Sequence, residues 1–309
     1  MRIEILLSTF NGERFLREQL DSILAQTHED WHLTARDDGS KDGTAGILRE
    51  YAAAHPERIT FAEDGRKLGY PDCFWKLLEE APAADLYAFC DQDDVWRADK
   101  LVCCEEMCRG EDPGRPLLYV HDYRISDGEL NVYDTYHMKE AGYREDYPWS
   151  LLYFVMTSGF AMALNGALRE RILRDKPAGK GLPHDRWIFW CGYFAGKILG
   201  DERTTVTYRR HERTVTETGK GNGTFLKEWW TKEIRGDRMA RWEEMGLRFT
   251  EDFREEMERK RPGIRKDWRV LCKGEKGVGN YFRRLFFPKR LKPSLAGEAA
   301  LRISFLLNK

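Results

Sequence analysis

Leu86-Tyr87-Ala88-Phe89-Cys90 is a short apolar run, and it leads directly into three carboxylates within four residues, Asp91-Gln92-Asp93-Asp94. An apolar run of this length that ends in polar residues is typical of a buried β-strand followed by a loop. Carboxylates spaced as in Asp91 and Asp93 can direct oxygens at one divalent cation, and hard cations such as Mg²⁺ or Mn²⁺ prefer oxygen ligands. The alternative is an acidic turn on the surface.

The remainder of the first 120 residues alternates between two patterns. Short apolar runs predict further strands over residues 3–7, 31–35, 59–61 and 117–120. Between the strands, apolar residues recur at helical spacing, and the last of these helical patterns begins near Ala98. The alternation predicts an α/β fold with a mostly parallel sheet flanked by helices.

Polar residues follow three of the predicted strands. Ser8, Thr9, Asn11 and Glu13 follow the first strand, Asp37, Asp38 and Gly39 follow the second, and the acids at 91, 93 and 94 follow the fourth. Ligands bind outside the carboxyl ends of parallel strands, so we expect these residues at one edge of the sheet. Each group alone is also typical of a helix cap or a turn. Five Asp at one edge, however, repel one another unless a cation or a donor-rich ligand is present.

The composition excludes several classes of protein. Of 309 residues, 41% are hydrophobic, which is enough for a sizeable core. Lys and Arg number 51 against 52 Asp and Glu, whereas a general nucleic-acid binder needs a basic surplus. The seven cysteines are an odd number without zinc-type spacing. Because the sequence shows neither a signal-peptide pattern nor an apolar run of roughly 20 residues, we expect a protein of the reducing cytoplasm.

Five segments carry a family resemblance. They are Leu7-Ser8-Thr9-Phe10-Asn11-Gly12-Glu13, Arg36-Asp37-Asp38-Gly39-Ser40-Lys41-Asp42-Gly43-Thr44, Asp91-Gln92-Asp93-Asp94-Val95-Trp96, His184-Asp185-Arg186-Trp187 and Tyr208-Arg209-Arg210-His211. In this order, over about residues 1–215, they resemble the family 2 glycosyltransferases with the GT-A fold, and within them the bacterial rhamnosyltransferase-like branch. The resemblance implies a nucleotide-diphospho-sugar transferase with a Rossmann-like catalytic domain.

The resemblance also implies roles for individual residues. The residues implied to bind the nucleotide-sugar are Ser8, Thr9, Asn11, Glu13, Asp38, Lys67, Gly69, Asp91 and Gln92. Asp38 would accept a hydrogen bond from the pyrimidine ring, and Lys67 and Gly69 would lie in the loop that closes over the base. A divalent cation, Mn²⁺ or Mg²⁺, would be held by Asp93 with Asp91 and His211. A solvated loop histidine is the open alternative for His211. Arg209 and Arg210 would either contact the diphosphate or be surface charges.

Asp185 resembles the catalytic base of the family. An inverting transfer needs one carboxylate that deprotonates the acceptor hydroxyl during its attack. The leaving nucleoside diphosphate needs no second acid, because the cation acts as a Lewis acid. A helix is predicted to begin near His184, so we expect the helix dipole to lower the pKa of Asp185. The alternative is a simple N-cap.

The character of the chain changes after Gly219-Lys220-Gly221-Asn222-Gly223, whose composition predicts a flexible joint. We therefore predict a catalytic domain over residues 1–218 and a helical, basic and aromatic region over 223–309. Residues 273–292 carry seven Lys or Arg against one acid, interleaved with aromatic residues. This pattern favours either peripheral contact with an anionic membrane through 273–309 or a charged helix packed on the catalytic domain.

The sequence thus predicts an inverting, metal-dependent glycosyltransferase of cell-surface polysaccharide or glycan biosynthesis. The donor is expected to be dTDP-rhamnose or a UDP-sugar, and the acceptor a glycan or lipid-linked glycan at the inner face of the cell membrane. One alternative is a nucleotidyltransferase of similar fold, but that class has a basic Gly-rich loop after the first strand, and here residues 8–13 contain no basic side chain before Arg14. The other is an inactive scaffold relative, although Asp93 and Asp185 are both present.

Overall fold

The computed structural model describes residues 1–140, 144–154, 156–175, 183–212, 231, 236–273 and 278–307. The chain divides into two compact units. Unit 1 consists of Met1–Met138 and Thr157–Glu212, and unit 2 consists of Lys139–Met156 and Arg213–Lys309. Each unit is described by itself below.

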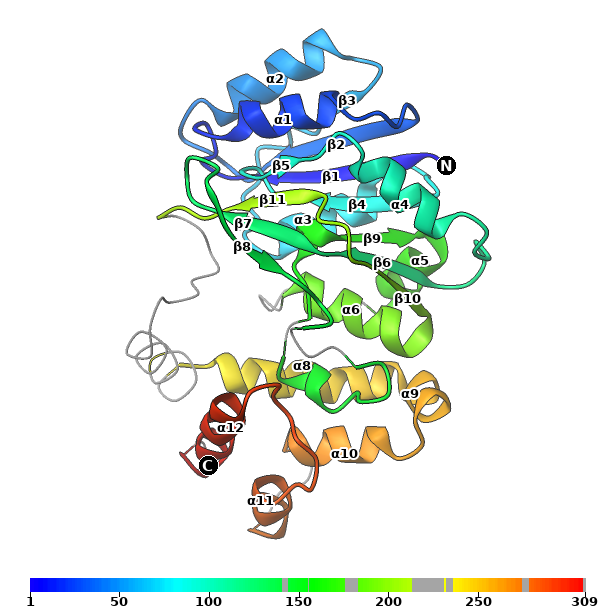
Figure 1. The fold of residues 1–309 in the computed structure, drawn as a ribbon, viewed down its shortest axis with the longest axis vertical. Coiled ribbons are helices and arrows are strands. Elements are labelled where there is room, and N and C mark those ends of the chain that lie inside the picture. The colour runs from blue at the N-terminus through cyan, green and yellow to red at the C-terminus, as the bar shows by residue number, and fades with distance from the viewer. Residues whose placement is uncertain are drawn as a thin grey trace. The chain divides into compact units, whose positions relative to one another are not determined.

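Unit 1 is built on a seven-stranded sheet in the order β10-β6-β9-β4-β1-β2-β3 (Figure 1). Its strands are β1 (Ile3–Thr9), β2 (Trp31–Asp37), β3 (Ile59–Phe61), β4 (Leu86–Cys90), β6 (Leu117–His121), β9 (Met162–Asn165) and β10 (Lys197–Asp201). All neighbours pair in parallel except β9, which runs antiparallel to β4 and β6. The predicted mostly parallel sheet is confirmed, and the fully buried β4 explains why its sequence is apolar throughout.

Helices connect and cover these strands. They are α1 (Leu16–Leu24), α2 (Thr44–Ala54), α3 (Asp72–Glu80), α4 (Lys100–Cys108), α5 (Gly166–Arg174) and α6 (His184–Ala195). The helical spacing of Leu16, Leu20 and Ile23 buries all three side chains in the core beneath β1. Asn165 ends β9 and starts α5, since its side chain accepts a hydrogen bond from the Leu168 amide at 3.0 Å.

A second, four-stranded sheet has the order β5-β11-β7-β8. Its strands are β5 (Val95–Trp96), β7 (Tyr123–Ser126), β8 (Val132–Tyr136) and β11 (Val206–Arg209). Two single-turn 3-10 helices, η1 (Ser150–Leu152) and η2 (Gly159–Ala161), lie in the connection to β9. Because β11 pairs with β5, the chain around Arg209 returns to the acids that follow β4.

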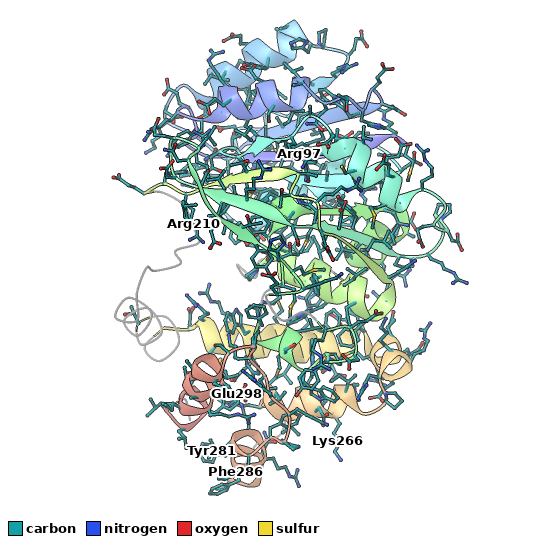
Figure 2. All side chains as sticks on the ribbon, viewed as in Figure 1. Arg97, Arg210, Lys266, Tyr281, Phe286 and Glu298 are labelled. Carbon is teal, nitrogen blue, oxygen red and sulfur yellow. The ribbon has the colours of Figure 1, made fainter. Side chains whose placement is uncertain are left out.

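Unit 2 contains α8 (Arg238–Asp252), α9 (Arg254–Lys260), α10 (Ile264–Leu271), α11 (Val278–Leu285) and α12 (Leu295–Leu307). Phe249, Phe253 and Trp268 are fully buried in its core. Figure 2 shows Tyr281 on α11 and Glu298 on α12. None of the described helices is long and apolar enough to cross a membrane.

Residues 139–156 belong to unit 2, although the predicted division placed them in the first domain. The hydroxyl of Tyr153 donates to the Leu271 carbonyl at 2.8 Å, and the Trp149 indole donates to Asp267 at 2.7 Å. Both aromatic side chains are buried. These long-range contacts explain the assignment, and no composition change marks it in the sequence.

Candidate functional site

Most of the predicted nucleotide- and metal-binding residues lie at the carboxyl ends of three adjacent parallel strands, β1, β2 and β4, whereas Lys67, Gly69, Asp185 and His211 come from later segments. In the sheet register, Leu7 of β1 pairs with Cys90 of β4, and Thr9 of β1 pairs with Asp37 of β2. The loops that follow β1, β2 and β4 are therefore neighbours. This is the edge at which open α/β sheets bind their ligands.

Side chains of the loop after β1 hold the loop after β2. Asn11 accepts a hydrogen bond from the Lys41 amide at 2.8 Å, and Glu13 accepts one from the Gly43 amide at 2.9 Å. The hydroxyl of Thr9, which is buried, donates to Asp37 at 2.9 Å. The structure thus places these residues where the sequence predicts, and it shows their polar atoms bonded to the neighbouring loop.

Gln92 links the loop after β4 to the loop after β1. Its carbonyl oxygen accepts from the Phe10 amide at 2.8 Å, and its amide nitrogen donates to the Phe10 carbonyl at 3.1 Å. A side-chain amide that satisfies both backbone groups of one residue fixes the separation of the two loops. Ser8, at the end of β1, is half-buried and hydrogen-bonds the Cys73 thiol.

Asp38 is buried and accepts three hydrogen bonds from within the protein. Its Oδ1 accepts from Arg36 at 2.8 Å and from the Leu68 amide at 2.7 Å, and its Oδ2 accepts from the Gly69 amide at 2.7 Å. Lys67 lies above the Phe10 ring, with its Nζ 4.1 Å from the ring centroid. Asp38 therefore holds the 64–69 loop down onto the end of β2, a role that the sequence analysis did not assign.

Asp93 and His211 are in direct contact. The Nε2 of His211 lies 2.8 Å from Oδ2 of Asp93, and both side chains are mostly buried. The His211 ring also packs against Phe15, with 4.8 Å between the ring centroids. The predicted link between the acidic cluster and the segment after β11 is therefore present in the geometry.

Arg209 holds the backbone that carries Asp93. It is 2% exposed, and its guanidinium donates to the Asp93 carbonyl at 3.0 Å, to the Gly128 carbonyl at 2.9 Å and to Glu18. Its backbone amide donates to Asp94 at 3.1 Å. Arg209 is therefore a buried positioning residue, which is neither of the two roles considered from the sequence.

The acids after β4 influence one another. Burial, together with the nearby charges of Asp93 and Asp185, raises the pKa of Asp91 to about 7. Burial also raises the pKa of Asp94 well above its ordinary value, with added repulsion from Asp93 and Asp91. Asp91, Asp93 and Asp185 thus share one region of negative potential, although Asp185 lies more than 90 residues away in the sequence.

Asp185 lies in the first turn of α6, as predicted, and accepts a hydrogen bond from the Arg186 amide at 2.7 Å. The expected lowering of its pKa is wrong. Burial raises the pKa of Asp185, and this effect outweighs the opposing effect of the Arg186 amide and of the Arg186 charge.

Tyr70 and His184 complete the surroundings of Asp185. Tyr70 is 50% exposed, and the protein around its hydroxyl, followed by the charges of Asp185 and Asp91, raises the pKa of that hydroxyl. The His184 ring stacks on Phe74 with 4.4 Å between centroids, and burial lowers its pKa to about 3. His184 is therefore a neutral packing residue among aromatic rings. Tyr70 was not predicted as a site residue, because a lone tyrosine in a polar loop gives no signal of its own.

The donor set fits a hard cation held by few protein ligands. Within the described residues, no group of three or more His, Cys, Asp or Glu side chains is arranged to hold a metal ion. Asp93 and His211 are the two predicted ligands that are in contact, and Asp91 is close enough to repel Asp93. An oxygen ligand and an imidazole suit Mn²⁺ or Mg²⁺ if a diphosphate and water supply the remaining positions.

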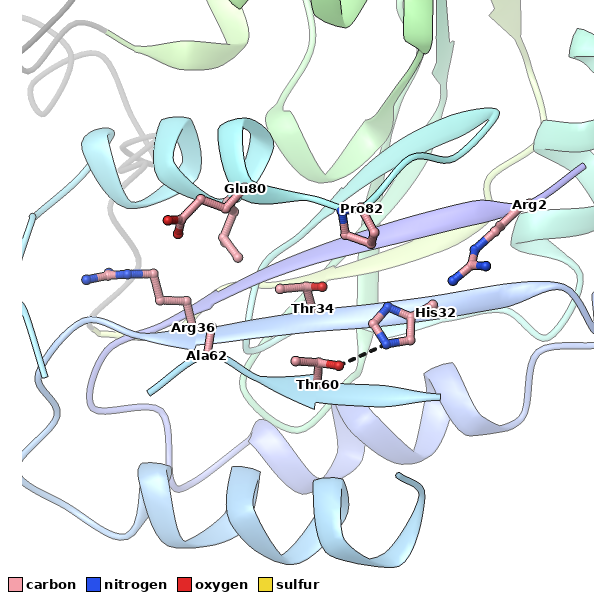
Figure 3. Close-up of a pocket in the computed structure, with 9 residues that line it drawn as sticks. Arg2, His32, Thr34, Arg36, Thr60, Ala62, Glu80 and Pro82 are labelled. Carbon is pink, nitrogen blue, oxygen red and sulfur yellow. Dashed lines mark hydrogen bonds between the residues drawn. The ribbon is translucent and has the colours of Figure 1, made fainter. Parts of the chain in front are cut away.

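A separate cavity of about 430 Å³ lies on the face of the sheet. Figure 3 shows it between α3 on one side and strands β2 and β3, with α1 and α2 behind the sheet. Arg2, His32, Thr34 and Thr60 are among the residues that line it. None of the predicted site residues lines this cavity, since they all follow the strand ends or lie in later segments.

Comparison with known proteins agrees with this arrangement. Residues 4–112 match the sequence profile of a family described as glycosyl transferase family 2. An uncharacterized glycosyltransferase of Nostoc sp. is 27% identical over 220 residues, which are 68% of this chain and 65% of that protein. The dTDP-rhamnosyl transferase RfbG of Shigella flexneri is 34% identical over 98 residues, which are 31% of this chain and 34% of that protein. The matches thus span less than two thirds of either relative.

Solved structures show the same fold. The S. aureus TarS 1-349 structure in complex with UDP-GlcNAc has a TM-score of 0.59 at 14% identity and covers 99% of this chain and 89% of that chain. The mannosyltransferase PcManGT from Pyrobaculum calidifontis in complex with GDP-Man and Mn²⁺ has a TM-score of 0.53 at 14% identity, covering 99% and 86%. The predicted GT-A fold and the resemblance to family 2 glycosyltransferases are confirmed.

Proposed function

We propose that this chain, whose residues 4–112 match the family 2 glycosyltransferases and whose fold is GT-A, transfers a sugar from a nucleotide-sugar to an acceptor hydroxyl. One observation carries the proposal: His211 contacts Asp93 in the loop after β4, and the charges of both Asp93 and Asp185 act on Asp91 in the same loop. A cation-binding pair next to an isolated carboxylate is the minimum that this transfer needs.

The proposed base is Asp185. Its carboxylate would take the proton of the acceptor hydroxyl as the oxygen attacks the anomeric carbon, and attack opposite the leaving diphosphate gives inversion. Because burial raises the pKa of Asp185, the carboxylate is a stronger base than an exposed aspartate. Tyr70 lies near the same acid and would contact the substrates there.

The proposed metal ligands are Asp93 and His211, with Asp91 beside them. A bound Mn²⁺ or Mg²⁺ would neutralise the charge of the departing diphosphate. The chain itself contributes the orientation of these ligands, because Arg209 holds the Asp93 backbone and Phe15 supports the His211 ring.

The nucleotide would occupy the edge formed by the loops after β1, β2 and β4. Ser8, Asn11, Glu13 and Gln92 shape this edge, and the 64–69 loop held by Asp38 borders it. We propose dTDP-rhamnose or a UDP-sugar as donor. The similarity to the dTDP-rhamnosyl transferase RfbG supports the first, and the similarity to TarS, whose structure contains UDP-GlcNAc, supports the second. The proposed acceptor is a glycan or lipid-linked glycan of cell-surface polysaccharide synthesis, at the inner face of the membrane.

The test combines donor hydrolysis and transfer with two variants. Asp93→Ala should abolish metal-dependent binding of the donor, whereas Asp185→Asn should keep donor binding and lower turnover by about a hundredfold or more. Asp134→Asn, an exposed position on β8, serves as the matched control. Normal turnover by Asp185→Asn would refute the assignment of the base. Failure of the parent protein to release nucleoside diphosphate from dTDP-rhamnose and UDP-sugars would favour the scaffold alternative.

A further inference from the structure

Helix α11 has its polar and apolar faces reversed relative to a helix that borders water. Asn280 and Arg284 are buried, whereas Val278, Phe282 and Phe286 are 74%, 51% and 73% exposed. A surface helix normally buries its apolar stripe and exposes its charges. The spacing of four residues places the three exposed apolar side chains on one face, which we call the α11 surface.

The buried side of α11 is anchored by charge. Arg284 is 2% exposed, forms an ion pair with the buried Glu243, and lies over the Phe305 ring at 4.3 Å. An ion pair removed from water costs desolvation free energy, and apolar residues of similar volume are often as stable or more stable at such a position. The reversed orientation is therefore not what optimal packing in water alone would select.

A second contact holds the carboxyl end of α11. The guanidinium of Arg302 on α12 donates to the carbonyls of Arg284, Leu285 and Phe287 at 3.0–3.1 Å and to that of Lys289 at 2.8 Å. These contacts satisfy carbonyls at the carboxyl end of the helix, where no intrahelical donor remains. Arg302 thus ties the end of α11 to α12, and Figure 2 shows Phe286 projecting at that end.

The segment that contains α11 is basic, and the acids beside it, Glu243 and Glu298, are paired with Arg284 and Arg302. Residues 278–297 contain five Lys or Arg and no Asp or Glu. Arg284 is used inside the unit, while Arg283, Lys289 and Arg290 are exposed at or beyond the end of α11. Exposed aromatic side chains flanked by cations match a bilayer interface with anionic headgroups, since the rings enter the acyl boundary and the cations remain at the headgroups.

We propose that the α11 surface docks unit 2 onto a membrane that contains negatively charged phospholipids. The rings of Phe282 and Phe286, which lie parallel with 6.4 Å between their centroids, enter the interface side by side. Arg283 and Lys289 contact the headgroups. Docking requires neither a donor nor turnover, so it stands or falls separately from the proposed transfer.

Co-sedimentation of the full chain with vesicles tests this inference. Vesicles of phosphatidylcholine alone are compared with vesicles that also contain phosphatidylglycerol. We expect binding only to the anionic vesicles, and a loss of affinity of about tenfold or more in the double variant Phe282→Ser with Phe286→Ser. The variant Arg283→Gln with Lys289→Gln should also lose about tenfold or more. The control is Val132→Ser with Tyr133→Ser, two positions on β8 that are each 48% exposed.

Each other result would overturn the inference. Equal binding of neutral and anionic vesicles would remove the role of charge, and unchanged binding by the Phe282 and Phe286 variant would remove the α11 surface. A concentration-dependent dimer that the same variant disrupts, without vesicle binding by the parent chain, would identify a second copy as the occupant. Donor hydrolysis by the variant is measured in parallel and should match the parent, which separates this outcome from failure of the proposed transfer.

Discussion

Replacement of Asp38 by Asn should release the 64–69 loop without unfolding the sheet. Asp38 is 4% exposed, and its two oxygens accept from Arg36, Leu68 and Gly69. In the variant, one oxygen remains for Arg36 and Leu68, so the new NH₂ group faces the Gly69 amide. One charge-assisted hydrogen bond is lost, and two donors then oppose each other in a buried position.

The magnitude follows from these contacts. A hydrogen bond to a charged group contributes about 1.5–3 kcal/mol, and a buried unsatisfied donor costs about 1–3 kcal/mol, so the loop should lose roughly 3 kcal/mol of local stability or more. Since 1.4 kcal/mol corresponds to about tenfold in an equilibrium constant, the open loop should become about a hundredfold more populated.

Limited trypsin digestion measures this opening, because Arg66 and Lys67 lie exposed within the loop. The rate of cleavage after these two residues, followed by mass spectrometry under native conditions, should rise about a hundredfold in Asp38→Asn. Asp134→Asn should leave the rate unchanged. A rise of less than about threefold in a variant with native circular dichroism would show that Asp38 does not hold the loop.

Three further variants test other parts of unit 1. Arg209→Met should lower stability by about 3 kcal/mol, because two backbone carbonyls lose their donor, and should weaken metal-dependent donor binding in titration calorimetry; unaltered binding would contradict its positioning role. Gly196→Ala should lower the melting temperature by the equivalent of about 3 kcal/mol, because its Cβ would lie 2.2 Å from a backbone oxygen, whereas Gly46→Ala, with open space, should not. Burial lowers the pKa of Lys100 to about 8 from 10.5, so the unfolded chain binds more protons between these pH values and folding gains stability as pH rises. Relative to Lys100→Met, the parent should therefore gain about 3 kcal/mol in urea unfolding over this range, and a flat difference would refute the shift.

Local sequence patterns were sufficient to predict five of the seven strands of the first sheet, whereas β9 and β10 were not predicted. Residues 59–61 and 86–90 form β3 and β4 with the predicted bounds, and α6 begins at His184 as expected. Apolar periodicity reports burial directly, which is why these elements could be recognised. The four-stranded sheet was not predicted as a unit. Its strand β5 has only two residues, and the partner β11 lies 110 residues later, so no local pattern encodes the pairing.

The candidate site was predicted in position but not in the detail of its contacts. The spacing of Asn11, Gln92 and Asp38 placed them at the correct edge, yet whether a polar atom faces a ligand or a neighbouring loop depends on the packing of both loops. Arg209 is the clearest case, since an arginine at the end of a strand resembles a surface charge until two loops and helix α1 meet around it. For Asp185, the helix dipole was readable from the sequence but the larger effect of burial was not.

The chain leaves unit 1 at Lys139, returns at Thr157, and leaves it again at Arg213. Residues 139–156 are therefore synthesised well before the helices that cover Trp149 and Tyr153. During translation these aromatic side chains have no packing partners until the last third of the chain is synthesised, because domains fold as they emerge from the ribosome. A polypeptide that stops at residue 212 would leave this inserted segment without its partners, so shortening the protein to its first unit should cost solubility unless residues 139–156 are removed as well.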